Sequence, residues 1–223
     1  MNEDAMTKQP SSVKSAALVL TGLLALVAGF VAWLQLQQPA ATPTVSHIET
    51  RSATLLPQLR SLQPFSLSDQ HGRPFTNQTL QGRWTFLSFG YTNCPDICPT
   101  TLAMLTSMGR QIDASGNSAD YQIAFVSVDP ERDTQQRLEE YIDFFNPVFL
   151  GVTGDDSELQ RLTRPLGILY AKVTTEKSAM GYVMDHSASI VLVDPQGRYH
   201  ALFSSPHDPD DMAQDFMTIT KNY

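Results

Sequence analysis

An apolar strand that runs directly into a turn carrying two cysteines leaves this chain few possible folds. Residues 83–90 read Arg-Trp-Thr-Phe-Leu-Ser-Phe-Gly, which suits an interior strand, and residues 100–111 read as a helix. The turn between them holds Cys94 and Cys98, the only cysteines of the chain. We expect Pro99 at the first helical position and Cys98 near the cap, where the helix dipole lowers the pKa of a thiol.

Strands and helices alternate through the rest of the chain. The pattern predicts a hairpin at 64–75, a strand at 121–128, helices at 133–145 and 155–166, a hairpin at 189–203 and a helix at 208–220. Alternation with helices gives parallel strand pairs, and hairpins add antiparallel ones, so we expect an α/β fold with a mixed central sheet flanked by helices. The cysteines would then lie at the carboxyl end of a central strand, where such sheets bind ligands.

The N-terminal region predicts a membrane anchor. Residues 16–34 carry no charge and have about the length of a transmembrane helix. Lys8 and Lys14 precede this run and no Lys or Arg follows until Arg51, which predicts a cytoplasmic tail at 1–15, a single-pass inner-membrane helix at 16–34 and a periplasmic remainder. A signal peptide cleaved near Ala40 is the alternative, but the run exceeds the usual apolar signal region. We expect a linker at 35–62 and one domain at 63–223.

Charge and compartment narrow the function. The net charge of −8 lies in the exported part, because Glu3 and Asp4 balance Lys8 and Lys14. Nucleic acid is therefore not an expected partner. The periplasm oxidises thiols unless a reductant or a metal protects them, so a close cysteine pair in an exported protein points to a function for that pair.

Three interpretations of Cys94 and Cys98 differ in their chemistry. A structural disulfide across so short a loop would remove little unfolded-state entropy. A redox-active disulfide is the second, although the thioredoxin-type motif has two intervening residues and this one has three. The third is a soft metal site that selects Cu(I), with one more ligand from elsewhere. A closed structural zinc site would need four Cys or His ligands.

The candidate third ligand is a histidine. His186 lies in a segment that reads as a loop just before the strand at 189–194, and Asp185 beside it can orient the ring. The other histidines lie in the expected linker, in a turn, in the second hairpin and in the loop beyond it: His47, His71, His200 and His207. Met184 is a weaker candidate. Position in the chain alone therefore makes His186 a candidate for the third ligand but does not decide the choice.

Several segments together resemble the Sco/SenC family. They are Phe-Gly-Tyr-Thr-Asn-Cys-Pro-Asp-Ile-Cys-Pro at 89–99, Val-Ser-Val-Asp-Pro-Glu-Arg-Asp-Thr at 126–134, Val-Thr-Gly at 152–154 and Asp-His-Ser at 185–187. The resemblance runs from about Pro64 to the C-terminus. It implies a membrane-anchored, thioredoxin-like copper protein that helps to assemble cytochrome c oxidase.

The resemblance also implies the site and the partners. Cys94, Cys98 and His186 would bind one copper ion per chain, as Cu(I) or Cu(II), for the copper-bearing subunit of the oxidase, with other copper chaperones or thiol reductants as further partners. No catalytic residue is expected for a metallochaperone. The alternative is a thiol–disulfide oxidoreductase in which Cys94 and Cys98 form a redox-active disulfide. Asn93 departs from the family, because many members have histidine there.

Overall fold

The computed structural model describes residues 26–30, 33, 48–176 and 181–223. The chain divides into two compact units, 1–47 and 48–223. Residues 26–30 and 33 are helical, whereas the rest of the expected membrane segment 16–34, the tail 1–15 and residues 35–47 lie outside the described residues. Within the described ranges, no helix combines the length and the apolarity that a membrane crossing requires.

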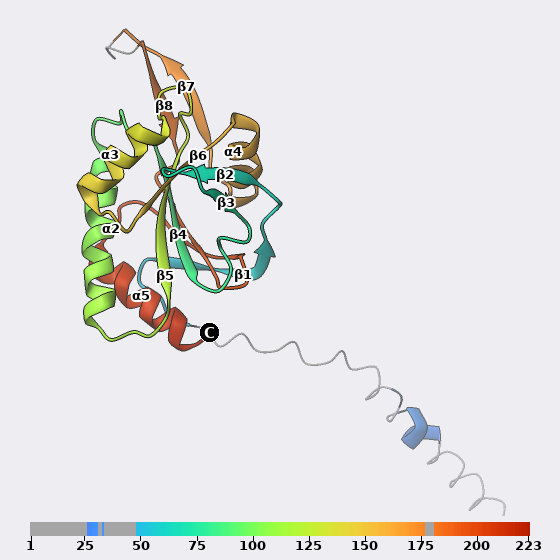
Figure 1. Cartoon of the computed structure of the whole chain (residues 1–223). Helices are drawn as coiled ribbons and strands as arrows, with labels where there is room; N and C mark the ends of the chain where they lie inside the picture. The colour runs from blue at the N-terminus through green and yellow to red at the C-terminus, as the bar shows by residue number, and fades with distance from the viewer. Residues whose placement is uncertain (1–25, 31–32, 34–47, 177–180) are drawn as a thin grey trace, which may run out of the picture. The chain divides into compact units, whose positions relative to one another are not determined.

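An eight-stranded mixed sheet forms the centre of the unit 48–223 (Figure 1). Its strand order is β1-β10-β9-β4-β5-β6-β2-β3. β4 pairs in parallel with β5, and β5 with β6, while the other neighbours are antiparallel. The strands are β1 (Ala53–Ser61), β2 (Ser66–Asp69), β3 (Pro74–Thr76), β4 (Trp84–Gly90), β5 (Tyr121–Ser127), β6 (Leu150–Thr153), β9 (Ile190–Val193) and β10 (Arg198–Phe203).

The helices cover both faces of this sheet. Figure 1 shows α2, α3 and α5 together on one side and α4 on the other. α2 and α3 are the crossovers that join the parallel strands, as such connections require. Their bounds are α2 (Ile97–Ala114), α3 (Gln135–Phe145), α4 (Asp156–Thr163), which continues into a 3₁₀ turn (Arg164–Leu166), and α5 (Pro209–Lys221). The predicted α/β plan with a mixed sheet between helices is confirmed.

The cysteine turn rests on the most deeply buried part of the fold. Every residue of β4 is buried, as befits a central strand between β9 and β5, and this explains its continuous apolar run. α2 turns one apolar face inward, with Leu102, Leu105, Met108 and Ile112 buried. The turn between β4 and α2 therefore has a rigid support at each end.

The predicted boundary between linker and domain is wrong. β1 falls inside the expected linker 35–62, pairs with β10 and belongs to a unit that begins at Ile48. Its pattern resembles a linker because β1 is an edge strand with mostly exposed residues, and Pro57 lies where the pairing register shifts. Proline is tolerated at such positions because an edge strand leaves one row of N–H groups unpaired.

A second, two-stranded sheet contains β7 (Tyr170–Thr174) and β8 (Tyr182–His186). Figure 1 shows this hairpin projecting from the main body. The sequence pattern predicts a loop at 182–187, and this prediction is wrong, because Tyr182–His186 pair antiparallel with Tyr170–Thr174. His186 is thus the last residue of a strand that the main sheet does not contain.

Candidate metal centre

The cysteine turn ends in the first turn of α2. The helix begins at Ile97, with Asp96 as the N-cap residue, so the expectation that Pro99 opens the helix is wrong by two positions. Pro99 still lies where a backbone N–H has no intrahelical partner, and its missing proton therefore removes no helix bond. Cys98 is the second helical residue and is 2% exposed.

A buried carboxylate fastens the start of the turn. Asp133 accepts hydrogen bonds from the backbone N–H of Thr92 at 2.8 Å, the hydroxyl of Thr92 at 2.6 Å and the hydroxyl of Ser127 at 2.5 Å. Burial raises the pKa of Asp133, although these three donors oppose the increase. Arg137 adds bonds to the Thr92 hydroxyl and, at 3.3 Å, to the side-chain oxygen of Asn93. Asn93 thus links the turn to α3.

The three expected ligands converge. One sulfur each from Cys94 and Cys98 and a ring nitrogen of His186 all lie within 4.8 Å of one another. Metal bonds of about 2.0 to 2.3 Å allow a spread of roughly 4.6 Å, so small side-chain rotations suffice to bind one ion. Nε2 of His186 is 3.4 Å from Sγ of Cys98, while Nδ1 is 3.1 Å from the carbonyl of Ser187. When Nδ1 carries the ring proton and donates it in a hydrogen bond to that carbonyl, Nε2 keeps a free lone pair that faces the sulfurs.

The two thiols are electrostatically unequal. A hydrogen bond from Cys98 lowers the pKa of Cys94 to about 4, with help from His186, although partial burial opposes this. The same interaction with Cys94, together with burial, raises the pKa of Cys98. The expectation that Cys98 carries the lowered pKa is wrong, because it is Cys94 whose pKa is lowered. The backbone N–H of Cys98 at the helix start points to the sulfur of Cys94, at 3.4 Å, so Cys94 receives the stabilisation.

His186 is ionised more easily than an isolated imidazole. Burial alone would lower the pKa of His186, but the Cys94 side chain, the Ser187 carbonyl and the charge of Asp185 outweigh it and raise that pKa. In the metal-free site, a thiolate at Cys94 and a proton on His186 therefore stabilise each other. Metal binding replaces the protons of such a site, so affinity for a metal rises as they are lost.

The other described histidines lie elsewhere and have other neighbours. Nδ1 of His71 is 3.5 Å from Glu139, and Nε2 of His207 is 2.7 Å from the carbonyl of Ala188. His200 stacks edge-on against Trp84. In the described parts of the chain, the only cluster with metal-ligand geometry is the one at Cys94, Cys98 and His186; His47 lies outside those parts.

Aromatic and charged side chains that sequence reasoning left without a role surround His186. The Tyr91 ring lies edge-on to the imidazole, with 6.1 Å between centroids. The Arg132 guanidinium lies 5.4 Å from the centre of the Tyr91 ring and 3.6 Å from that of Tyr182. Arg132 and Asp133 lie in the segment 126–134, which resembles the family, and that resemblance is the sequence feature that could have identified them.

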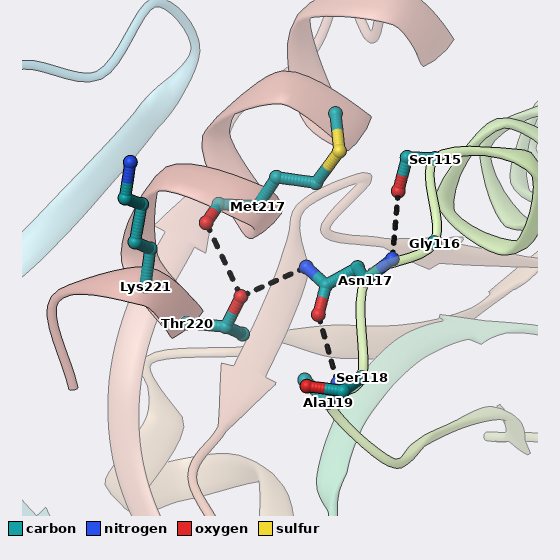
Figure 2. A pocket seen from close by; sticks show the side chains of 8 residues that line it. All are labelled: Ser115, Gly116, Asn117, Ser118, Ala119, Met217, Thr220 and Lys221. Atoms are coloured by element: carbon teal, nitrogen blue, oxygen red, sulfur yellow. Dashed lines mark hydrogen bonds between the residues drawn. The ribbon is translucent and has the colours of Figure 1, made fainter.

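Two hollows have different relations to this centre. A hollow of about 300 Å³ beside His186 is lined by Leu169, Tyr170, Ala171, Asp185, His186 and Ser187. Figure 2 shows another, of about 470 Å³, between the C-terminal ends of α2 and α5. α2 has 18 residues, so the second hollow is about 27 Å from the cysteines. Several of the polar groups that Figure 2 shows there bond to one another, as when Asn117 donates to Thr220 at 3.0 Å.

Comparison with known proteins identifies the family. The sequence model of SCO1/SenC matches residues 54–221. The chain belongs to the SCO1/SenC family. Within this family, the SCO2-like protein RP587 of Rickettsia prowazekii is 36% identical over 159 residues, which cover 71% of this chain and 75% of that protein.

Solved SCO1/SenC structures share the fold. Arabidopsis thaliana ScoI with copper bound has a TM-score of 0.68 and 35% identity, over 72% of this chain and 98% of that one. Yeast Sco1 with copper bound has a TM-score of 0.67 and 30% identity, over 74% of this chain and 90% of that one. The thioredoxin-like fold that the family resemblance implied is thereby confirmed.

Proposed function

We propose that this chain is a membrane-anchored copper chaperone that holds one copper ion with Cys94, Cys98 and His186. It delivers that ion to the copper-bearing subunit of cytochrome c oxidase. The observation that carries the proposal is the approach of the three ligand atoms to within 4.8 Å of one another. Two thiolates and an imidazole are soft to borderline ligands, which favour Cu(I) over hard ions.

The surroundings of the site suit a cargo that must leave again. Three protein ligands leave room for an incoming thiolate, and copper then passes to the client by ligand exchange. The hollow beside His186 gives a client segment access to the ring. The half-exposed Cys94 is the sulfur that such a segment meets first, because Cys98 is buried.

Metal analysis of the full-length chain in detergent, reduced and without oxygen, tests the ligand set. We expect one copper per chain in the wild type and in the control His71→Ala, whose ring lies at the surface. Loss of either thiolate removes a principal soft ligand, so Cys94→Ser and Cys98→Ser should abolish tight binding. His186→Ala keeps both sulfurs and should weaken Cu(II) more than Cu(I). Equal copper in the double cysteine variant and the wild type would refute the site.

Oxidase activity in cells tests the delivery step. Under limiting copper and at normal protein level, His186→Ala should lower the activity although both cysteines remain. Near-wild-type activity in that strain would count against copper delivery.

The membrane anchor is part of this proposal. The uncharged run 16–34 supports it, as do the exposed apolar side chains Leu26, Val27, Phe30 and Trp33 in the described helical residues. The tail 1–15 would then be cytoplasmic and the unit 48–223 periplasmic. A phosphatase reporter active only in the periplasm, fused after His47, should be active. A mature form that begins near Ala41 would contradict a retained anchor.

Thiol–disulfide exchange is the second candidate function, favoured by the lowered pKa of Cys94, about 4. The Cys94 thiolate would attack a client disulfide and release one client thiolate. Cys98, after losing its proton, would attack the mixed disulfide, release the second and form the Cys94–Cys98 disulfide. This route does not require His186, so client reduction by His186→Ala at the wild-type rate, together with normal oxidase activity in cells, would favour it. The oxidised protein should not bind Cu(I), since the sulfurs are shared.

A further inference from the structure

The outer edge of β8, which faces away from β7, is contacted by side chains and not by another strand. Within the described residues, β8 pairs only with β7. Antiparallel pairs alternate between hydrogen-bonded and non-hydrogen-bonded ones. The backbone N–H groups of Ser187 and Thr175 donate to the carbonyls of Leu169 and Gly181. These flanking bonds fix the alternation, so the backbone groups of Tyr182, Met184 and His186 point away from β7.

Two side chains occupy that outer edge. Nη1 of Arg132 donates to the carbonyl of Tyr182 at 3.2 Å. The hydroxyl of Tyr91 lies close enough to the backbone of Met184 to interact with it: burial raises the pKa of Tyr91, and this backbone opposes the increase. Both partners lie on the strand that ends at His186, four and two residues before the ligand. Arg132 and Tyr91 therefore take the place that a neighbouring strand would have.

Arg132 is itself held in place from several sides. Its side chain is 9% exposed, and its guanidinium lies 3.6 Å from the centre of the Tyr182 ring. Nε donates to the carboxylate of Asp129, which also accepts the Tyr182 hydroxyl at 2.8 Å. Nη2 is buried and has no hydrogen-bond partner among the described residues, so the bonds of Nε and Nη1 and the ring contact are what fix the guanidinium. A lysine could still pair with Asp129, but it has no planar fork to reach both Asp129 and the Tyr182 carbonyl.

We infer that Arg132 is a positioning residue for the metal centre, which acts with Tyr91 by holding the outer edge of β8 and so keeps His186 facing the two cysteines. The inference rests on the proposed copper site. It assigns to Arg132 an effect that passes mainly through His186, because its side-chain hydrogen bonds lead to Asp129 and to β8, and it meets the cysteine turn only at the Tyr91 ring, 5.4 Å away. Outer partners that orient a metal ligand typically change metal affinity by about 10- to 100-fold.

A double-mutant cycle on the full-length chain tests this route. Cu(I) affinity is measured against a competing Cu(I) chelator in the wild type, Arg132→Lys, His186→Ala and the double variant. We expect Arg132→Lys to weaken binding at least about tenfold when His186 is present, and less than about twofold when it is absent. Equal losses in both backgrounds, or no loss in either, would overturn the inference. Tyr91→Phe, which keeps the ring but removes the hydroxyl, should behave like Arg132→Lys and serves if that variant does not fold.

A metal-free measurement separates this inference from the proposed function. In the reduced protein without copper, Arg132→Lys should speed amide exchange along β8 and leave β4 and β5 unchanged. The matched control is Arg198→Lys, which alters another arginine paired with a buried aspartate, Asp194, in the β9–β10 hairpin. It should leave both copper affinity and β8 exchange unchanged. A wild type that binds no copper would refute the proposed function, whereas unchanged β8 exchange in Arg132→Lys would refute the positioning role.

Discussion

Gly90 lies directly against the sulfur of Cys98. A Cβ atom added at Gly90 would be 2.6 Å from Sγ of Cys98 and 2.8 Å from the ring of Phe125, both closer than packed atoms approach. The last residue of β4 thus leaves the space that the buried ligand sulfur fills. Any side chain here competes with Cys98 for that space.

Gly90→Ala should therefore lower copper affinity and destabilise the fold by about 1 to 3 kcal/mol, the usual cost of overpacking a core. Copper titration and thermal unfolding measure the two effects. Gly151→Ala is the matched control, because its added Cβ would lie 2.8 Å from Ile142 in a region without metal ligands. It should destabilise the fold similarly but leave copper affinity unchanged. Equal affinity losses in the two variants would contradict the specific role of Gly90.

Asp133→Asn should loosen the cysteine turn. The amide keeps one acceptor oxygen where the carboxylate has two, so at least one of the hydrogen bonds that Thr92 and Ser127 donate loses its acceptor, at a cost of about 1 to 3 kcal/mol for a buried group. We expect lower stability in urea unfolding and faster alkylation of Cys98. Asp143→Asn, at an exposed position on α3, is the control for the lost charge and should change neither.

Cys94 should react much faster than Cys98 with an alkylating reagent in the reduced, metal-free protein. Its lowered pKa, about 4, keeps it a thiolate at neutral pH, whereas burial and the interaction with Cys94 hold the proton on Cys98. Mass spectrometry after brief labelling at about pH 6, below the ordinary thiol pKa, should find the label on Cys94. In Cys98→Ala, which removes the donor that lowers the pKa of Cys94, the rate at that pH should fall. Preferential labelling of Cys98 would refute this assignment.

Asp194 should make the free energy of unfolding fall as the pH is lowered. Burial alone would raise the pKa of Asp194, but His200 and Arg198 outweigh it and lower that pKa. A depressed folded-state pKa contributes stability that is present above the unfolded value, about 3.9, and is lost as pH falls through the folded value. Urea unfolding from about pH 6 to about pH 3 should show a smaller loss of stability in Asp194→Asn than in the wild type. Parallel curves would contradict this.

The buried centre of the fold was readable from sequence because its pattern is strong. β4 and β5 form continuous apolar runs, and the β9–β10 hairpin has an unambiguous turn at Pro195–Arg198. β1 and β7 were missed because most of their residues are exposed, so they show little of the alternation that marks a half-buried strand. Backbone pairing with β10 and β8 positions these two strands, and in β1 Ala53, Leu55 and Leu56 also pack against the core.

Only part of the candidate site could be predicted from the sequence. Cys94 and Cys98 lie close in sequence, and the strand-to-helix turn placed them correctly. The choice of His186 came from the family resemblance, because local pattern cannot show which loop or strand returns to the cysteines from 88 positions away. The unequal pKa values were not predictable, since they depend mainly on the hydrogen bond between the two side chains and on the different burial of the two sulfurs.

The ligands belong to two separately built parts of the chain. Cys98 lies in a helix packed on the eight-stranded sheet, and His186 ends a hairpin outside it, 88 positions later. An ion bound to both closes a loop of that length, which in the chain-entropy treatment restricts the unfolded state by roughly 4 to 5 kcal/mol, as a long-range disulfide does. Cargo would thus double as a removable cross-link. The protein with its ion bound would be more stable to thermal unfolding and to proteolysis, and release of the ion would return it to the less stable metal-free form.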